Sequence, residues 1–348
     1  MPLEKKFPPK SLEDLTRQSA SNFLALLRAS KNKPITLIFG AGVSASAGLP
    51  TWKELLRKIC GTFFCHWEFE IKHEGGNPST PPTELSIAFY DDFFWSENAN
   101  NLAKQLSEED ALLVTQQIKN CIKDADWRYM LNKILYNSDI YGNPRITSSK
   151  LIDSLISYCK TSNNVSAIIS YNWDNVFENV SKNRDLKFSP IWVKNSSHDS
   201  DSIPIYYPHG YLPLGGGPTT KLLLAESDYH KEATEIYSWA NLLQIQLFCT
   251  TKCIFLGTSL KDPNLRRLLR ISKNNSLDYH YSFLPSNSMV SKEQCMKESL
   301  FDYDLLQLGI KTIRYPLDHS SEDPFIELPK LIDHLVQHVT DENKIWQD

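Results

Sequence analysis

A short apolar run that ends in a Gly-Ala-Gly turn constrains the fold of this chain more than any other feature. The stretch "ITLIFGAGVSASAGLPTW" occupies residues 35–52. Its first residues are β-branched and apolar, which is typical of a buried parallel strand. "TWKELLRKICGTFF" then has helical spacing, and Pro50 and Thr51 signal the helix start. The stretch therefore predicts a strand, a loop over residues 40–48 and a helix.

The same alternation of strand and helix recurs along the chain. Strand-like runs include "VSAIIS", "IYYP", "KLLLA", "KCIFLG", "YHYSFLPS" and "IKTIRYPL". Helical patterns separate several of them, and "ATEIYSWANLLQIQLFCTT" is expected to form one long helix. Residues 11–30 should form an amphipathic helix, and residues 62–160 read as mainly helical. The order predicts an α/β fold with a mostly parallel sheet, helices on both faces and a helical insertion subdomain.

Composition excludes several classes of protein. The 348 residues are 41% hydrophobic and 22% charged, as in ordinary globular proteins. The net charge of −4 argues against a protein that coats nucleic acid, so no direct nucleic-acid binding is expected. No apolar run approaches the roughly 18 residues of a membrane helix, and "MPLEKKFPPK" does not resemble a secretory signal. The seven cysteines include no CxxC pair, which favours reduced thiols in the cytoplasm and no metal site.

The glycines of the first loop are suited to a phosphate. Gly40-x-Gly42-x-x-Ala45 loosely satisfies the fingerprint of dinucleotide-binding proteins, in which backbone N–H groups approach a pyrophosphate. The acidic residue expected about 20 positions later is missing, and no Gly-Lys-Ser/Thr motif of a nucleoside triphosphatase occurs. A tight turn with a purely structural role remains the alternative.

Polar side chains also follow later strands. Asn172 and Asp174 in "SYNWDNVFE" come directly after a buried strand, where an amide can hold water and a carboxylate can accept a hydrogen bond. His209 in "YPHGYLP" could accept a proton from a hydroxyl. The alternatives are a helix-capping role for Asp174 and a hydrogen-bonded structural role for His209.

A second small polar loop follows the strand "KCIFL". Gly257, Thr258 and Ser259 could hydrogen-bond a ribose or a phosphate. Asp262, which precedes a proline, also has the features of a helix start. Ligands of open parallel sheets bind at the carboxyl ends of strands, so these motifs share the expected location of a site.

Taken in order, "GAGVSASAGLPTW", "YNWD", "PHG" and "GTSLKDPNLRRLL" resemble the Sir2 superfamily. The similarity is to the bacterial SIR2-like type found in antiphage defence systems. Thr51-Trp52-Lys53 replaces the acidic-aromatic-arginine run of the deacetylating sirtuins, and their four-cysteine zinc module is absent. The resemblance implies a Rossmann-like, DHS-type NAD-binding core over residues 35–61 and 161–348. Residues 1–34 would be an N-terminal helix and assembly segment, and residues 62–160 the helical insertion.

This resemblance implies a role for each of these residues. Asn172 and His209 would be catalytic: Asn172 would position ribose or the attacking water, and His209 would contact the ribose and serve as general base. NAD+ would be the substrate, with no metal required. Asp174 would help to hold the nicotinamide amide. The pyrophosphate would lie on Gly40, Ala41, Gly42 and Ser44, the distal nucleotide on Thr258 and Ser259, and further NAD contacts on Gly48, Pro50, Trp52, Gly257 and Asp262.

The implied activity is hydrolysis of NAD+ to ADP-ribose and nicotinamide, by a toxic effector of antiphage defence that depletes NAD. A cyclic product stays open. An NAD- or ADP-ribose-binding regulatory module without catalysis is the alternative, and a protein deacylase or ADP-ribosyltransferase is a weaker one. The resemblance also implies control by homo-oligomerisation or by a partner acting in trans, such as a HerA-like helicase/ATPase or another sensor. The helix at residues 11–30 and the helix after Phe325 are the expected subunit contacts.

Overall fold

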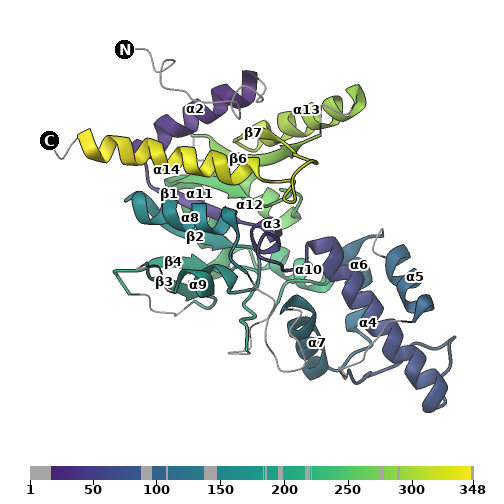
Figure 1. Cartoon of the computed structure of the whole chain (residues 1–348). Coiled ribbons are helices and arrows are strands. Elements are labelled where there is room, and N and C mark those ends of the chain that lie inside the picture. Colours follow the sequence, from purple (N-terminus) through teal and green to yellow (C-terminus); the bar gives the residue numbers. More distant parts are fainter. Residues whose placement is uncertain are drawn as a thin grey trace.

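A seven-stranded parallel sheet forms the centre of the molecule (Figure 1). The computed structural model describes residues 17–345, except residues 88–95, 107–108, 137–146, 183, 185, 195–198, 216–219, 221, 275–277 and 288–290. Within these residues every strand pairing is parallel, in the order β3-β4-β2-β1-β5-β6-β7. The strands are β1 (Ile35–Phe39), β2 (Val165–Ser170), β3 (Phe188–Ile191), β4 (Ile203–Tyr206), β5 (Lys252–Leu256), β6 (His280–Ser286) and β7 (Ile310–Pro316). The predicted α/β fold with a parallel sheet is confirmed, and its organisation is Rossmann-like.

The strand order reverses direction at β1. From β1 the chain builds β2, β3 and β4 on one side, and it then returns to place β5, β6 and β7 on the other. β1 pairs with both β2 and β5 along its length. In such sheets the loops after the two strands at the reversal point diverge and leave a crevice at the carboxyl edge. The loops that follow β1 and β5 therefore define where a ligand site should form.

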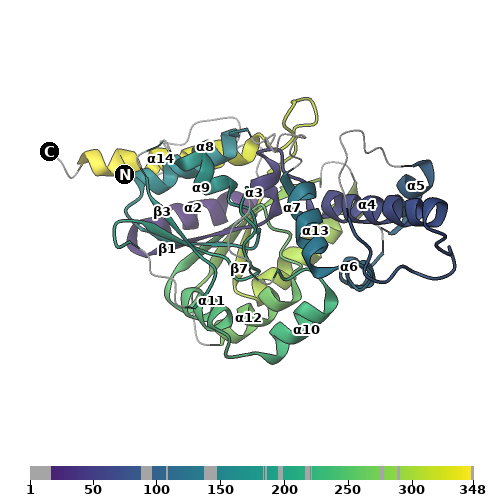
Figure 2. The ribbon, with the colours of Figure 1, turned by 90° about the horizontal axis from the view of Figure 1, so that it is seen from below.

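Helices cover both faces because side chains alternate along each strand. In β1, Leu37 and Phe39 belong to one buried cluster and Ile38 belongs to another. The first cluster joins the sheet to α2 (Arg17–Asn32), α8 (Lys150–Thr161) and α14 (Glu327–Ile345). The second joins it to α11 (Trp239–Thr250), α12 (Pro263–Lys273) and α13 (Lys292–Gln307). Figure 2 shows α8 and α14 on one side of the sheet and α11 and α12 on the other.

The helical insertion forms a lobe beside the sheet (Figures 1 and 2). It consists of α4 (Trp52–His73), α5 (Glu97–Leu106), α6 (Ala111–Lys119) and α7 (Asp124–Tyr136), which share a buried apolar cluster that also includes Trp173, Leu222 and Leu224. Its predicted limits of 62–160 stay a prediction. α4 is one continuous helix across residues 61–62, and α8, which begins within the 62–160 range, packs on the sheet. The hydrophobic face of each helix, more than its position in the sequence, determines the lobe to which it belongs.

Two sequence-based element predictions were wrong. The run "KLLLA" is not a strand in its described part: the N–H groups of Leu224 and Ala225 donate to Asp228 Oδ2, at 3.3 and 3.0 Å, at the start of α10 (Glu226–Thr234). The expected long helix is interrupted after α10, because Ser238 caps a new helix start by accepting from Asn241 N–H at 3.2 Å. The short strand β3 was not predicted.

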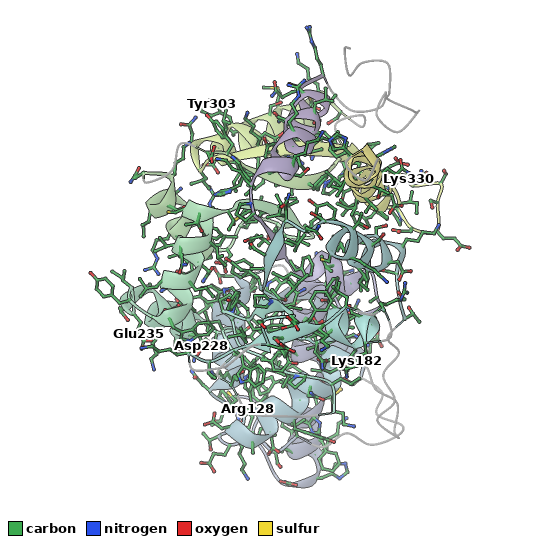
Figure 3. All side chains as sticks on the ribbon, turned by 90° about the vertical axis from the view of Figure 1, so that its left-hand side faces the viewer. Arg128, Lys182, Asp228, Glu235, Tyr303 and Lys330 are labelled. Atoms are coloured by element: carbon green, nitrogen blue, oxygen red, sulfur yellow. The ribbon has the colours of Figure 1, made fainter. Side chains whose placement is uncertain are left out.

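The two helices expected to contact other subunits use their apolar faces inside the fold. Phe23 and Leu26 of α2 are 0% exposed, and Leu331 of α14 is 1% exposed. Residues 1–16 of the predicted assembly segment lie outside the described residues. Exposed apolar side chains occur instead on α13, where Leu300 is 72% exposed and Tyr303 lies at the periphery (Figure 3). The apolar faces of α2 and α14 thus belong to the core, and contacts of these helices with other subunits stay a prediction.

None of the helices in the described ranges combines the length and the apolar character needed to cross a membrane.

Candidate functional site

An open groove lies at the carboxyl ends of β1 and β5, where the strand order reverses. Its volume is about 1590 Å³, more than the ~300–1,000 Å³ common for small-molecule sites. One wall comes from the loop after β1 and another from the loop after β5. The predicted site residues that line it are Gly42, Gly48, Pro50, Gly257, Thr258 and Ser259. The volume of the groove is large enough for a dinucleotide, and six of the predicted site residues line it.

Cationic side chains dominate the charge of this groove. Six basic and four acidic side chains line it, although the whole chain carries a net charge of −4. A diphosphate is favoured by such surroundings, because charge-assisted hydrogen bonds to phosphate are stronger than neutral ones. None of these basic residues was predicted, since each resembles an ordinary surface charge in its own segment. The basic ones are Arg57, Lys58, Lys150, Lys261, Lys297 and Arg314.

The glycines of the first loop hold it against the loop after β5. Gly40 N–H donates to Leu256 O at 3.0 Å, and Gly42 N–H donates to Gly257 O at 2.8 Å. A Cβ added at Gly42 would lie 2.8 Å from the Gly257 Cα. Gly257 itself has φ +63°, in the left-handed region that favours glycine. Gly42 and Gly257 therefore have a packing role whether or not a pyrophosphate binds beside them. A contact of these glycines with phosphate stays a prediction.

A chain of hydrogen-bonded polar side chains links the loops after β1 and β2. Asn172 Nδ2 donates to Gly40 O and to Ser44 Oγ, both at 2.8 Å. Ser44, in the short helix α3 (Ala41–Ala45), also hydrogen-bonds Asp174. Burial raises the pKa of Asp174, and the hydrogen bond from Ser44 opposes that shift. Since both hydrogens of the Asn172 amide are used, its Oδ1 is the atom suited to hold a water or a ribose hydroxyl.

Asp174 also has the structural role that the sequence left open. Its Oδ1 accepts the N–H of Val176 at 3.1 Å, at the start of α9 (Val176–Ser181). The side chain is 5% exposed. A contact with the nicotinamide amide stays a prediction beside this observed helix-start contact.

His209 lies buried in the loop after β4. It is 5% exposed, and its ring packs edge-on against Tyr171 with centroids 4.7 Å apart. Its Nε2 has no hydrogen-bond partner among the described residues. Burial lowers the pKa of His209, and the charge of Asp262 partly opposes this. The imidazole is thus held neutral, with one buried nitrogen available to a ligand or a reacting water.

Tyr229 connects His209 to the loop after β5. Its ring lies 6.0 Å from that of His209, and its hydroxyl donates to Asp262 Oδ2 at 2.8 Å. Asp262 Oδ1 accepts the N–H of Leu265 at 2.7 Å and so caps α12, as its neighbouring proline indicated. Tyr171 and Tyr229 were not predicted as site residues. Their only sequence signal is their position: Tyr171 directly precedes "NWD", and Tyr229 follows the run "LLLAESD".

The predicted residues therefore divide into two groups. Gly42, Gly48, Pro50 and Gly257–Ser259 line the open groove, whereas Ser44, Asn172, Asp174, His209 and Asp262 do not line it. Gly40 connects the two groups, because its carbonyl accepts a hydrogen bond from Asn172 and its N–H donates to Leu256 O at the end of β5. Trp52 is 38% exposed and meets Trp173 edge-on at 6.4 Å, between the insertion and the β2 loop.

A second buried carboxyl, Glu178, lies near Asp174. Its Oε1 accepts a hydrogen bond from the Tyr207 hydroxyl, while its Oε2 has no partner among the described residues. Burial raises the pKa of Glu178 to about 7, and the hydrogen bond from Tyr207 opposes the shift. The folded protein therefore binds a proton here that the unfolded chain releases above a pKa of about 4.5.

Replacing Glu178 with glutamine should remove one pH-dependent part of the stability. Because the folded-state pKa is raised, this group stabilises the fold at low pH, and the contribution is lost as pH rises from about 4.5 to 7. Relative to wild type, the free energy of unfolding of Glu178→Gln should rise by about 3 kcal/mol from pH 4.5 to pH 8, because burial raises the wild-type pKa from 4.5 to about 7. Urea unfolding at several pH values measures it, with the exposed Glu109→Gln as control. A pH-independent difference would show that Glu178 ionises normally.

Within the described residues, no cluster of three or more histidine, cysteine or acidic side chains is arranged to hold a metal ion.

The family comparison agrees with this arrangement. Residues 166–307 match the family model of the SIR2-like domain. The match runs from β2 to the end of α13 and includes Asn172, His209 and the loop after β5. The chain thus contains a SIR2-like domain over residues 166–307. SIR2-like domains bind NAD+ and are in general NAD-dependent enzymes. No curated protein matches the chain.

Proposed function

We propose that this protein hydrolyses NAD+ to ADP-ribose and nicotinamide. The observation that carries the proposal is the state of His209, a buried imidazole kept neutral by burial with Nε2 unpartnered. A buried polar atom without a partner is costly unless a ligand completes it. A neutral imidazole at a strand end, on a domain that binds NAD+, is suited to take a proton from water.

The reaction breaks the bond between C1′ of the ribose and the nicotinamide nitrogen. The electron pair of that bond leaves with nicotinamide, which becomes neutral, and C1′ acquires positive character. A water oxygen forms the new bond to C1′ and transfers its proton to His209 Nε2, which later releases it to solvent. The balance is one NAD+ and one water to one ADP-ribose, one nicotinamide and one proton.

Asn172 would orient the attacking water in this scheme. Its amide hydrogens are bound to Gly40 O and Ser44 Oγ, which fixes the side chain. Its Oδ1 would accept a hydrogen from the water and direct a lone pair toward C1′. The basic groove side chains would hold the pyrophosphate through charge-assisted hydrogen bonds.

Separation of the products of NAD+ by chromatography tests the proposed reaction. Purified protein should convert NAD+ to equal amounts of nicotinamide and linear ADP-ribose. Cyclic ADP-ribose as the main product would mean that a ribose hydroxyl, and not water, attacks C1′. Release of nicotinamide only when an acylated or acceptor peptide is added would instead support the deacylase or ADP-ribosyltransferase alternatives.

A regulatory NAD-binding module is the second candidate. It is favoured by the separation of the two residue groups, because Asn172 and His209 do not line the groove that would hold the dinucleotide. NAD+ that binds tightly by calorimetry and is recovered intact, at all protein concentrations and with cell lysate added, would favour this candidate over the hydrolase.

We further propose that the enzyme acts in the cytoplasm as a toxic effector of antiphage defence. Its activity would be controlled by self-association or by a partner acting in trans, such as a HerA-like ATPase or another sensor. NAD depletion by an uncontrolled enzyme would harm its own cell. The exposed Met296, Leu300 and Tyr303 on α13 suit a protein contact better than α2 or α14. Activity per chain should therefore rise with protein concentration; a monomer that is fully active alone would contradict this control.

A further inference from the structure

The insertion contacts two segments that follow His209 in the chain. Tyr136, the last residue of α7, is 2% exposed, and its hydroxyl donates to Leu212 O at 2.6 Å. Leu212 lies three residues after His209, and its own N–H donates to Trp173 O at 2.7 Å. Leu212 thereby connects the loop that carries Asn172, through Trp173 O, to the hydroxyl of Tyr136 in the insertion.

Further bonds surround the Tyr136 hydroxyl. The oxygen also accepts from Asn175 N–H at 3.4 Å, and Asn175 Oδ1 accepts Leu214 N–H at 3.0 Å. Asn132, one turn earlier on α7, donates to Pro213 O at 3.3 Å. The pKa of Tyr136 is raised well above its usual value, chiefly by burial, so the hydroxyl stays protonated and keeps its donor role. Three consecutive residues, 212–214, are bonded to α7 or to Asn175.

A second set of contacts reaches the other side of the site. Lys119, at the end of α6, lies 3.3 Å from both oxygens of Asp228 in α10, and Gln116 Oε1 accepts Ser227 N–H at 3.0 Å. Asp228 precedes Tyr229, whose ring packs against His209. Leu223 N–H, just before α10, donates to His209 O at 2.9 Å. The insertion thus contacts α10, and Leu223 and Tyr229, just before and within α10, contact the backbone carbonyl and the ring of His209.

We propose that the insertion keeps His209 in its working position and that Tyr136 is the positioning residue through which it acts. The inference rests on the proposed function for its kinetic consequence only. A misplacement of about 1 Å in a catalytic group can lower turnover by 10²-fold without removing substrate contacts. Loss of the Tyr136 hydroxyl frees Leu212 O and loosens residues 209–214, so turnover should fall while NAD+ binding is kept.

The test compares Tyr136→Phe with Tyr158→Phe. Tyr158 is also a buried tyrosine of the main core, on α8, and its hydroxyl interacts with Ser162 at the end of that helix, not with residues 209–214. In Tyr136→Phe, kcat should fall at least tenfold, KM should change less than threefold, and amide exchange at Leu212 and Leu223 should accelerate. Tyr158→Phe should leave all three unchanged.

Equal effects of the two variants, or unchanged exchange in Tyr136→Phe, would overturn the inference. Lys119→Met provides a second variant if Tyr136→Phe does not fold, because the lysine side chain is 25% exposed and Asp228 keeps its backbone partners. It should accelerate exchange at Leu223. If the wild-type protein does not cleave NAD+, the proposed function fails, and the exchange measurements alone decide the role of Tyr136.

Discussion

His209→Gln should lower the rate of NAD+ cleavage by 10²- to 10⁴-fold while NAD+ affinity stays within a few-fold of wild type. That range is typical for the loss of a general base. Glutamine has nearly the size of histidine but cannot take a proton at neutral pH. Because burial lowers the pKa of His209 in the free protein, the neutral base persists below pH 6.5, and the acidic limb of the wild-type kcat/KM profile should lie below that value.

His230→Gln is the matched control for this prediction. His230 is an exposed histidine of α10, one residue after Tyr229, and it should affect neither kcat nor its pH profile. Retention of more than a tenth of wild-type turnover in His209→Gln would mean that another group accepts the proton. An acidic limb that persists in the variant would lead to the same conclusion.

Gly257→Ala should destabilise the fold by about 3 kcal/mol or more and should abolish NAD+ binding. Two effects combine at this position. The residue has φ +63°, which costs an L-amino acid roughly 1–2 kcal/mol. The new Cβ would also lie 2.5 Å from Val43 N and 2.9 Å from Gly42 C, which are backbone atoms that cannot move without separating the two loops.

Gly75→Ala separates these two effects. Gly75 has φ +76°, but a Cβ there meets nothing within 4 Å. The free energy of unfolding of Gly75→Ala should therefore fall only by the conformational cost of the positive φ, roughly 1–2 kcal/mol, and NAD+ binding should stay normal. Urea unfolding and calorimetry with NAD+ measure both variants. Similar losses of stability in the two, or normal NAD+ binding by Gly257→Ala, would show that the contact between the loops does not shape the groove.

The parallel sheet could be predicted because its central strands have unambiguous patterns. β1 and β2 are short apolar runs with β-branched residues, and both are buried almost throughout. β3 escaped prediction because "FSPI" is four residues long and contains a proline, which suits only an edge strand. "KLLLA" misled because Asp228, which satisfies its backbone, comes three residues later in a helix.

The site could be predicted only where its residues follow strands directly. Asn172, His209 and Gly257 fall at the carboxyl edge, so the topology alone brings their segments together. The basic lining of the groove and the Tyr136 contact come from helices and loops far apart in the chain. Tyr136 and Leu212 are separated by 76 residues, and no local pattern encodes their hydrogen bond.

The most direct test of the account measures bound and cleaved NAD+ in the same samples of wild type and His209→Gln. Calorimetry should give similar affinities for both proteins. Chromatography should then find nicotinamide and ADP-ribose in equal amounts from the wild type and almost none from the variant. Equal cleavage by both proteins would contradict the role of His209. Intact NAD+ with the wild type, under every concentration and added lysate, would contradict the proposed hydrolase itself.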